Sequence, residues 1–135
     1  MESTMTNEEK VKHWVYLSDN DIDTAEVLVK NSRNLHAGFM CQQAVEKIFK
    51  GYFAKVKDEI PPFIHDLSKI AERAGFYDLL NDDQISLLEE LNPLYIEARY
   101  SSYKAVVAEA MTNDKTQSIF EQTKGLIQWM KEKMQ

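Results

Sequence analysis

The polar residues best suited to chemistry lie in the stretch between positions 36 and 50. Four of them recur at intervals of seven, four and three residues: His36, Gln43, Lys47 and Lys50. On a helix this spacing places all four on one face, where an imidazole, an amide and two ammonium groups can hold phosphate oxygens and base edges. From spacing alone, a solvated helix face with an i,i+4 ion pair between Glu46 and Lys50 is the commoner interpretation. We assign the four residues to a candidate ligand site and leave both interpretations open.

Two short stretches supply further candidate ligand contacts. His65 and Asp66 follow a Pro-Pro pair; the carboxylate can cap a helix, and the imidazole can transfer a proton or contact a phosphate. Arg99 and Tyr100 can bind a phosphate through two parallel hydrogen bonds and stack on a base. Structural roles compete at both places: a capped helix with a surface histidine, and an arginine paired with a carboxylate beside a core tyrosine.

Metal, cofactor and thiol chemistry are poorly represented. The single cysteine, Cys41, lies inside a predicted helix without a basic neighbour that would activate it, which indicates a small core residue. His13, His36 and His65 have no spacing typical of a metal-binding pair. We therefore expect no metal and no cofactor.

Long helices must position these residues, because the chain has only 4 Gly and 3 Pro in 135 residues and thus few turn formers for short strands. Apolar spacing predicts a first helix of about 25 residues, capped by Thr6. A second helix is expected to begin near residue 34 or 35 and to run to about residue 57, with Pro61 and Pro62 preventing its continuation.

Three shorter predictions complete the chain. A third helix is expected over residues 65–75, and a fourth begins at residue 81 or 82. Pro93 either kinks that helix or separates two, and residues 103–111 form either a helical turn or a loop. Asn113 is expected to cap a last helix. The predicted fold is an all-α, antiparallel up-and-down bundle of four to five helices.

Length and charge limit the class of protein. The chain fits one domain over residues 8–135 after a flexible N-terminus at residues 1–7. The net charge of −6 argues against coating nucleic acid, although residues 41–57 carry four lysines against one glutamate. No apolar run is long enough to span a membrane, and the free cysteine and polar N-terminus favour the cytoplasm.

Three stretches of the sequence combine into a recognisable pattern. They are the run His36 through Cys41-Gln42-Gln43-Ala44-Val45-Glu46-Lys47 to Lys50, then Pro62 with His65-Asp66-Leu67, and then Tyr95 with Ala98-Arg99-Tyr100. In order and separation they resemble the HEPN family (higher eukaryotes and prokaryotes nucleotide-binding domain), over about residues 8–131. The resemblance implies a helical homodimer, often encoded beside a minimal nucleotidyltransferase in a toxin–antitoxin-like pair. It implies ligand binding at Gln43, Lys47, His65, Asp66, Arg99 and Tyr100.

The chain departs from the HEPN ribonucleases, which carry an Arg, four to six residues and then a His. Arg99 is followed by no His up to Val107, and a lysine is a poor proton acceptor near neutral pH. The leading hypothesis is therefore a nucleotide- or RNA-binding homodimer that pairs with a nucleotidyltransferase subunit. Two others stay open: a metal-independent ribonuclease that uses His65 or His36 instead, and a purely structural adaptor.

Overall fold

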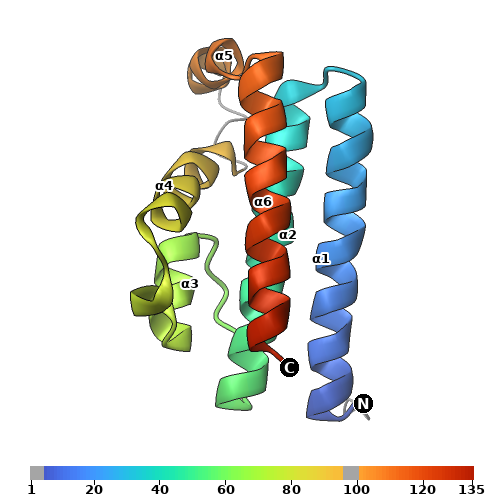
Figure 1. Ribbon diagram of the computed structural model, residues 1–135, viewed down its shortest axis with the longest axis vertical. Helices are drawn as coiled ribbons and strands as arrows, with labels where there is room; N and C mark the ends of the chain where they lie inside the picture. The colour runs from blue at the N-terminus through green and yellow to red at the C-terminus, as the bar shows by residue number, and fades with distance from the viewer. Residues whose placement is uncertain (1–4, 96–100) are drawn as a thin grey trace.

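The computed structural model describes residues 5–95 and 101–135, with only the backbone of residues 101–104. Within these residues the regular structure is entirely helical, which confirms the predicted all-α class (Figure 1). The α-helices are α1 (Asn7–Lys30), α2 (Asn34–Lys57), α3 (Leu67–Ala74), α4 (Asp82–Leu91), α5 (Ser101–Ala110) and α6 (Asn113–Lys133). Two 3-10 turns, η1 (Tyr77–Leu79) and η2 (Asn92–Leu94), come after α3 and α4.

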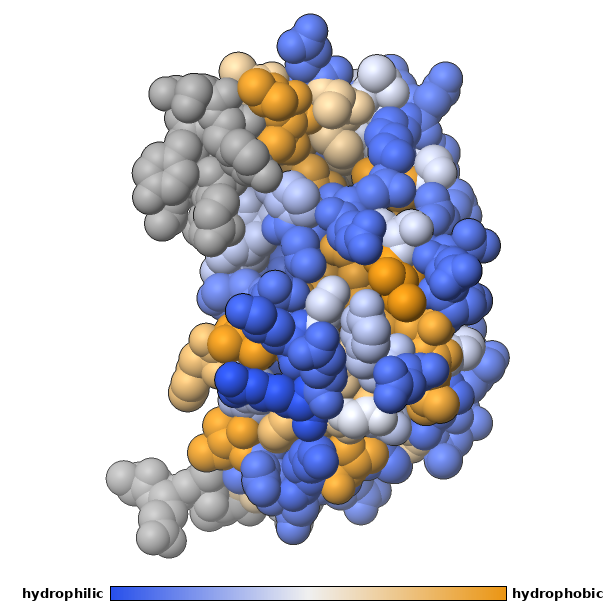
Figure 2. Space-filling model, turned by 90° about the vertical axis from the view of Figure 1, so that its left-hand side faces the viewer, coloured by the Kyte–Doolittle hydropathy of each residue, from blue (hydrophilic) through white to orange (hydrophobic). Residues whose placement is uncertain are grey.

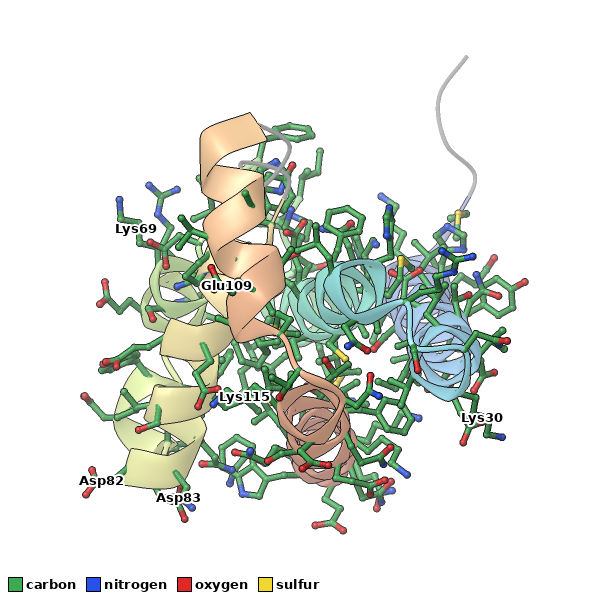
Figure 3. All side chains as sticks on the ribbon, turned by 90° about the horizontal axis from the view of Figure 1, so that it is seen from above. Lys30, Lys69, Asp82, Asp83, Glu109 and Lys115 are labelled. Carbon is green, nitrogen blue, oxygen red and sulfur yellow. The ribbon has the colours of Figure 1, made fainter. Side chains whose placement is uncertain are left out.

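Helix α2 is the centre of the bundle. Helix α1 runs antiparallel to it, and α6 lies along both, in the same direction as α2 (Figure 1). The shorter helices α3 and α4 cover another side of α2, while α5 crosses one end of the bundle (Figures 1 and 3). Because two long helices run the same way, the segment that joins them must return along the bundle, and α3 to α5 make that return.

The core confirms that α2 is central. Its buried apolar side chains include Val45, Ile48 and Phe49, each 0% exposed. The Phe49 ring meets Phe76 edge to face, with centroids 4.7 Å apart, an arrangement favoured by the ring quadrupoles. A broad apolar stripe is what a helix with neighbours on several sides requires.

Local capping sets most helix boundaries where the sequence predicts them. The Thr6 side chain accepts a hydrogen bond from the Glu9 amide (3.1 Å) at the start of α1. Asn81 and Gln84 form a capping box on α4, and Gly75 ends α3 with a φ of 84°, a conformation that glycine adopts without steric cost.

Three details differ from the expectations or resolve them. The cap of α6 is Thr112 rather than Asn113, because the Thr112 hydroxyl accepts from the Lys115 amide at 3.2 Å. Pro93 lies in η2, so it ends the α4 region and separates α4 from the next helix instead of kinking it. Residues 103–111, where the sequence left helix or loop open, belong mostly to α5, which spans Ser101–Ala110.

The surface over α3, α4 and α5 is mainly hydrophilic, with separate apolar spots (Figure 2). No helix in the described part of the chain is long and apolar enough to cross a membrane.

Candidate functional site

A row of hydrogen-bonded polar side chains runs along the middle of α2. We call this row the α2 polar ladder; it consists of Gln42, Gln43, Glu46, Lys47 and Lys50. Within it, Lys47 donates to Gln43 (3.2 Å), Gln43 to Gln42 (2.8 Å), and Gln42 to Glu46 (3.2 Å). The i,i+4 spacing of a helix brings Lys47 to Gln43 and Gln42 to Glu46, the bond from Gln43 to Gln42 joins adjacent residues, and neighbouring elements hold both ends of the row.

Glu46 is the central acceptor of the ladder. Its carboxylate lies 3.1 Å from the Lys50 ammonium, and the two side chains are only 5% and 8% exposed. The Nδ1 atom of His65 lies 3.0 Å from Oε1 and 3.2 Å from Oε2 of the same carboxylate. The ion pair that the sequence suggested on a solvated face is therefore buried, and it supports a histidine from outside the helix.

Lys47 connects the ladder to α1. Its ammonium lies 2.7 Å from the Asp21 carboxylate, with the side chains 20% and 13% exposed. Both candidate lysines of α2 therefore have carboxylate partners within the protein, so the ladder is not a row of free cations.

The ladder forms one network of contacting side chains together with Asp21, His65 and Tyr95. His65 is the most accessible member of this network. Its side chain is 48% exposed, and its ring stacks on Tyr95 with centroids 4.1 Å apart and planes at 18°. Its backbone carbonyl accepts a hydrogen bond from Gln42 (3.1 Å). Tyr95 in turn packs beside Phe39 of α2, with ring centroids 6.1 Å apart. The imidazole is thus held by one ring nitrogen, one face and its backbone.

Asp66 orders the segments that carry these two rings. Its Oδ1 accepts from the amides of Ser68 (3.0 Å) and Lys69 (3.3 Å), so it caps α3 as expected. Asn92 of η2 donates to the same oxygen (3.3 Å) and accepts from the Leu67 amide (3.0 Å). The start of α3 and the turn that precedes Tyr95 are therefore tied together, which places the His65–Tyr95 stack.

The structure brings together only some of the residues that the sequence singled out. Gln43, Lys47, Lys50 and His65 belong to one network, and Asp66 borders it. His36 is exposed on the first turn of α2, two helical turns before Gln43, and is not part of the ladder. Arg99 and Tyr100 lie outside the described residues. A ligand-binding role for all eight residues stays a prediction.

Sequence reasoning missed other members of the network as site residues. Asp21, Gln42 and Glu46 are buried partners, and Tyr95 supplies the stacking face. Tyr95 belongs to the third stretch of the HEPN-like pattern, so the pattern did contain a signal for it. Nothing in the spacing of Asp21 indicates that it meets Lys47.

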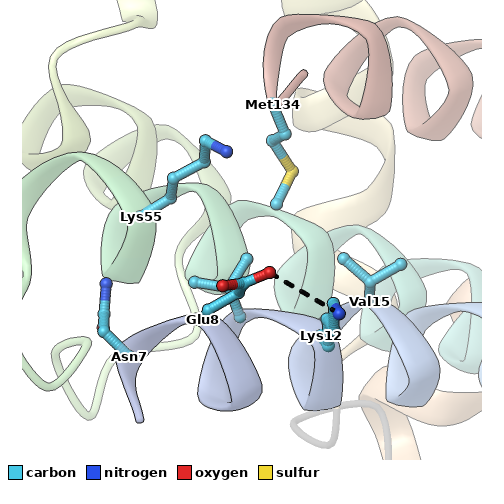
Figure 4. A pocket seen from close by; sticks show the side chains of 7 residues that line it. Asn7, Glu8, Lys12, Val15, Lys55 and Met134 are labelled. Atoms are coloured by element: carbon cyan, nitrogen blue, oxygen red, sulfur yellow. Dashed lines mark ion pairs between the residues drawn. The ribbon is translucent and has the colours of Figure 1, made fainter.

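Three hollows in the described part of the chain lie around the C-terminal end of α2 and not beside the ladder. One of about 510 Å³ is lined by α1, Lys55 and Met134, with Glu8 and Lys12 paired at 3.6 Å on its wall (Figure 4). Two more, of about 470 and 440 Å³, flank Ile60. His65 is not among the residues that line these three hollows.

Two further observations concern the cysteine and possible metal ligands. Burial raises the pKa of the Cys41 thiol to about 12, which makes it a core residue rather than a nucleophile. Among the described residues, no group of three or more His, Cys, Asp or Glu side chains is placed to hold a metal ion.

Comparisons with known proteins agree with this fold. The family model described as the HEPN domain matches residues 11–133. The chain belongs to the HEPN domain family. The crystal structure of TT1696 from Thermus thermophilus is similar, with a TM-score of 0.78 and 16% identity over 92% of this chain and 98% of that one. That likeness concerns the fold alone. A comparison with curated proteins gives no match.

Proposed function

We propose that the chain is a nucleotide- or RNA-binding HEPN protein whose ligand contacts the exposed side of the His65–Tyr95 stack. The observation that carries this proposal is the arrangement of His65: half-exposed, stacked on an aromatic ring and held by a buried carboxylate. A flat, oriented imidazole offers a face on which a nucleobase stacks, and base–aromatic stacking contributes about 1–3 kcal/mol per base.

The charge of the site suits a small ligand. Lys47 and Lys50 are paired with Asp21 and Glu46, so stacking and hydrogen bonds would provide the affinity along α2. Arg99 and Tyr100 come four and five residues after Tyr95, and we propose that they contribute the phosphate and second base contacts. In the same proposal, His36, Gln43 and Asp66 border the ligand.

The family suggests the setting of this binding. We propose that the protein is a cytoplasmic homodimer that pairs with a minimal nucleotidyltransferase in a toxin–antitoxin-like system. Co-expression with the product of the neighbouring gene tests the pairing. A stable complex supports it, and separate elution of the two proteins contradicts it. If the complex forms but no nucleotide or RNA binds, the adaptor hypothesis replaces the binding one.

Titration of labelled nucleotides and short single-stranded RNAs tests the binding. His65→Ala should weaken affinity at least tenfold, because it removes the stacking ring. His13→Ala is the matched control, since His13 is an exposed histidine on α1 outside the network. Equal loss in both variants, or no binding by the wild-type protein, would overturn the proposal.

A second candidate, metal-independent RNA cleavage, is favoured by the contact between Glu46 and His65. A carboxylate that orients an imidazole is the arrangement of a general base. In this reaction, His65 would take the proton of a ribose 2′-hydroxyl, whose oxygen attacks the adjacent phosphorus. The 5′-oxygen would leave with a proton from water, which gives a 2′,3′-cyclic phosphate. Cleavage in the presence of a chelator that His65→Ala abolishes would support this candidate; its persistence in the variant would exclude it.

A further inference from the structure

We infer that Glu46 holds the His65 imidazole with its proton on Nδ1, so that Nε2 selects a hydrogen-bond donor of the ligand, a sugar hydroxyl or a base amino group. This inference rests on the proposed function, because it names the ligand group that the same site takes. It assigns His65 a role different from the phosphate contact that the sequence suggested.

The tautomer is determined by the contacts of Glu46. An ionised carboxylate has acceptors only, and the Glu46 carboxylate forms an ion pair with the buried Lys50 ammonium 3.1 Å away. The Nδ1 atom, at 3.0 and 3.2 Å from the two oxygens, must therefore be the donor. In a neutral imidazole the other nitrogen then carries a lone pair.

The surroundings of Nε2 favour a neutral donor over a phosphate. Among the described residues, the charged groups next to His65 are Glu46 and Lys50 of α2, which form their own pair, and Asp66, the next residue in the chain. Tyr95 covers one face of the ring. A phosphate at this position would meet a lone pair and a nearby carboxylate, whereas a hydroxyl or amino group would donate to the lone pair.

The protonation state can be measured without a ligand. Long-range ¹H–¹⁵N NMR of the free wild-type protein at pH 8 should show an unprotonated Nε2 and a protonated Nδ1 for His65. A protonated Nε2 would overturn the inference. In the double variant Glu46→Leu with Lys50→Met, which removes the acceptor and its cation together, the proton should shift toward Nε2.

Binding measurements then test the selection. The probes are adenosine, 2′-deoxyadenosine, inosine and inorganic phosphate, each titrated between pH 5.5 and 8. Histidine changes its charge in this range. A neutral ring accepts a hydrogen bond at Nε2 and an imidazolium ring does not, so adenosine should bind severalfold more tightly at pH 8 than at pH 5.5, whereas phosphate at His65 would bind more weakly. Weakening with 2′-deoxyadenosine would identify the sugar hydroxyl as the donor, and weakening with inosine the amino group.

The outcomes separate this inference from the proposed function. If RNA and nucleotides bind but affinity for adenosine falls as the pH rises, the donor assignment is wrong and the binding function stands. If no nucleoside, nucleotide or RNA binds, both are wrong. His65→Ala should abolish the pH dependence of adenosine binding, while His13→Ala should preserve it.

Discussion

The middle and the C-terminal end of α2 differ in what they offer to a ligand. In the middle, residues 42–50, buried polar side chains contact one another and hold His65. At the C-terminal end and in the loop that follows it, residues 53–63, hollows flank Ile60, and Ile60 and Phe63 are 77% and 92% exposed. The hydrogen-bonded polar groups therefore lie in one region, and the open hollows and exposed apolar side chains lie in the other.

This difference shows why volume alone does not locate the candidate site. A functional side chain needs partners that limit its rotation and set its hydrogen-bonding state. His65 has such partners in Glu46, Gln42 and Tyr95. An exposed apolar side chain such as Phe63 has space around it, but space does not orient a group.

The largest expected effect tests whether the stability of the fold depends on the buried ion pair between Glu46 and Lys50 in the middle of α2. Glu46→Leu should lower the free energy of unfolding by about 3–5 kcal/mol, because it leaves the Lys50 charge buried without a partner. Urea denaturation measures this loss. Adding Lys50→Met should recover most of it, since both charges are then replaced by apolar groups. A single variant as stable as wild type would show that the pair is not buried in solution.

Cys41 tests the burial of the same region by chemical reactivity. A thiol pKa raised by burial from 9.0 to about 12 lowers the thiolate fraction at pH 8 by about a thousandfold. Alkylation should therefore be slow in the folded protein and fast in urea. The raised pKa stabilises the fold fully below pH 9, and this contribution is lost as the pH rises toward 12. Cys41→Ala should not lose this contribution to stability between pH 9 and pH 12. Equal alkylation rates with and without urea would contradict the burial of the Cys41 thiol.

Gly51 lies where the two regions meet, and it tests how closely α1 and α2 approach. An added Cβ would lie 3.1 Å from the Trp14 Cβ, an atom that cannot move without its helix. Gly51→Ala should therefore destabilise the protein by about 1–3 kcal/mol in thermal or urea unfolding.

Gly125→Ala is the matched control on α6, because no atom lies within 4 Å of its added Cβ. It should raise stability by about 0.5–1 kcal/mol through helix propensity. Similar effects at both glycines would show that the contact between α1 and α2 is not tight.

The smallest expected effect concerns the loop that follows α2. Phe63→Ser should change the free energy of unfolding by less than about 0.5 kcal/mol, because the side chain is 92% exposed. It should also leave nucleotide binding unchanged. A loss of stability above about 1 kcal/mol is larger than an exposed position gives. It would show that Phe63 makes stabilising contacts, as the buried side chains in the middle of α2 do.

The sequence predicted the helices well because their signals are local. The Thr6 cap, the extent of α2 and the glycine at the end of α3 each depend on a few neighbouring residues. The Thr112 cap was displaced by one residue because Thr and Asn both suit a cap, and only the backbone decides between adjacent candidates. Helix α5 was ambiguous because its Ala- and Val-rich stretch has no distinct apolar face.

The candidate site was only partly predictable. Gln43, Lys47 and Lys50 were placed on one face by their spacing, and the local pair of Glu46 with Lys50 was visible too. Their partners were not, because Asp21 is 26 residues from Lys47 in the chain. Tyr95 is 30 residues from His65, and no local sequence pattern predicts that two rings so far apart in the chain stack.

By itself, the sequence determined the helical class, the helix boundaries to within about a residue or two and the family resemblance, because periodicity, caps and short motifs are local properties. Only the tertiary structure decided that Lys47 pairs with Asp21 of α1, that the Lys50–Glu46 pair is buried, and that Glu46 orients His65. The physical reason is that the rotation of each helix about its axis determines which side chains are buried together. That rotation is set by packing across the whole bundle.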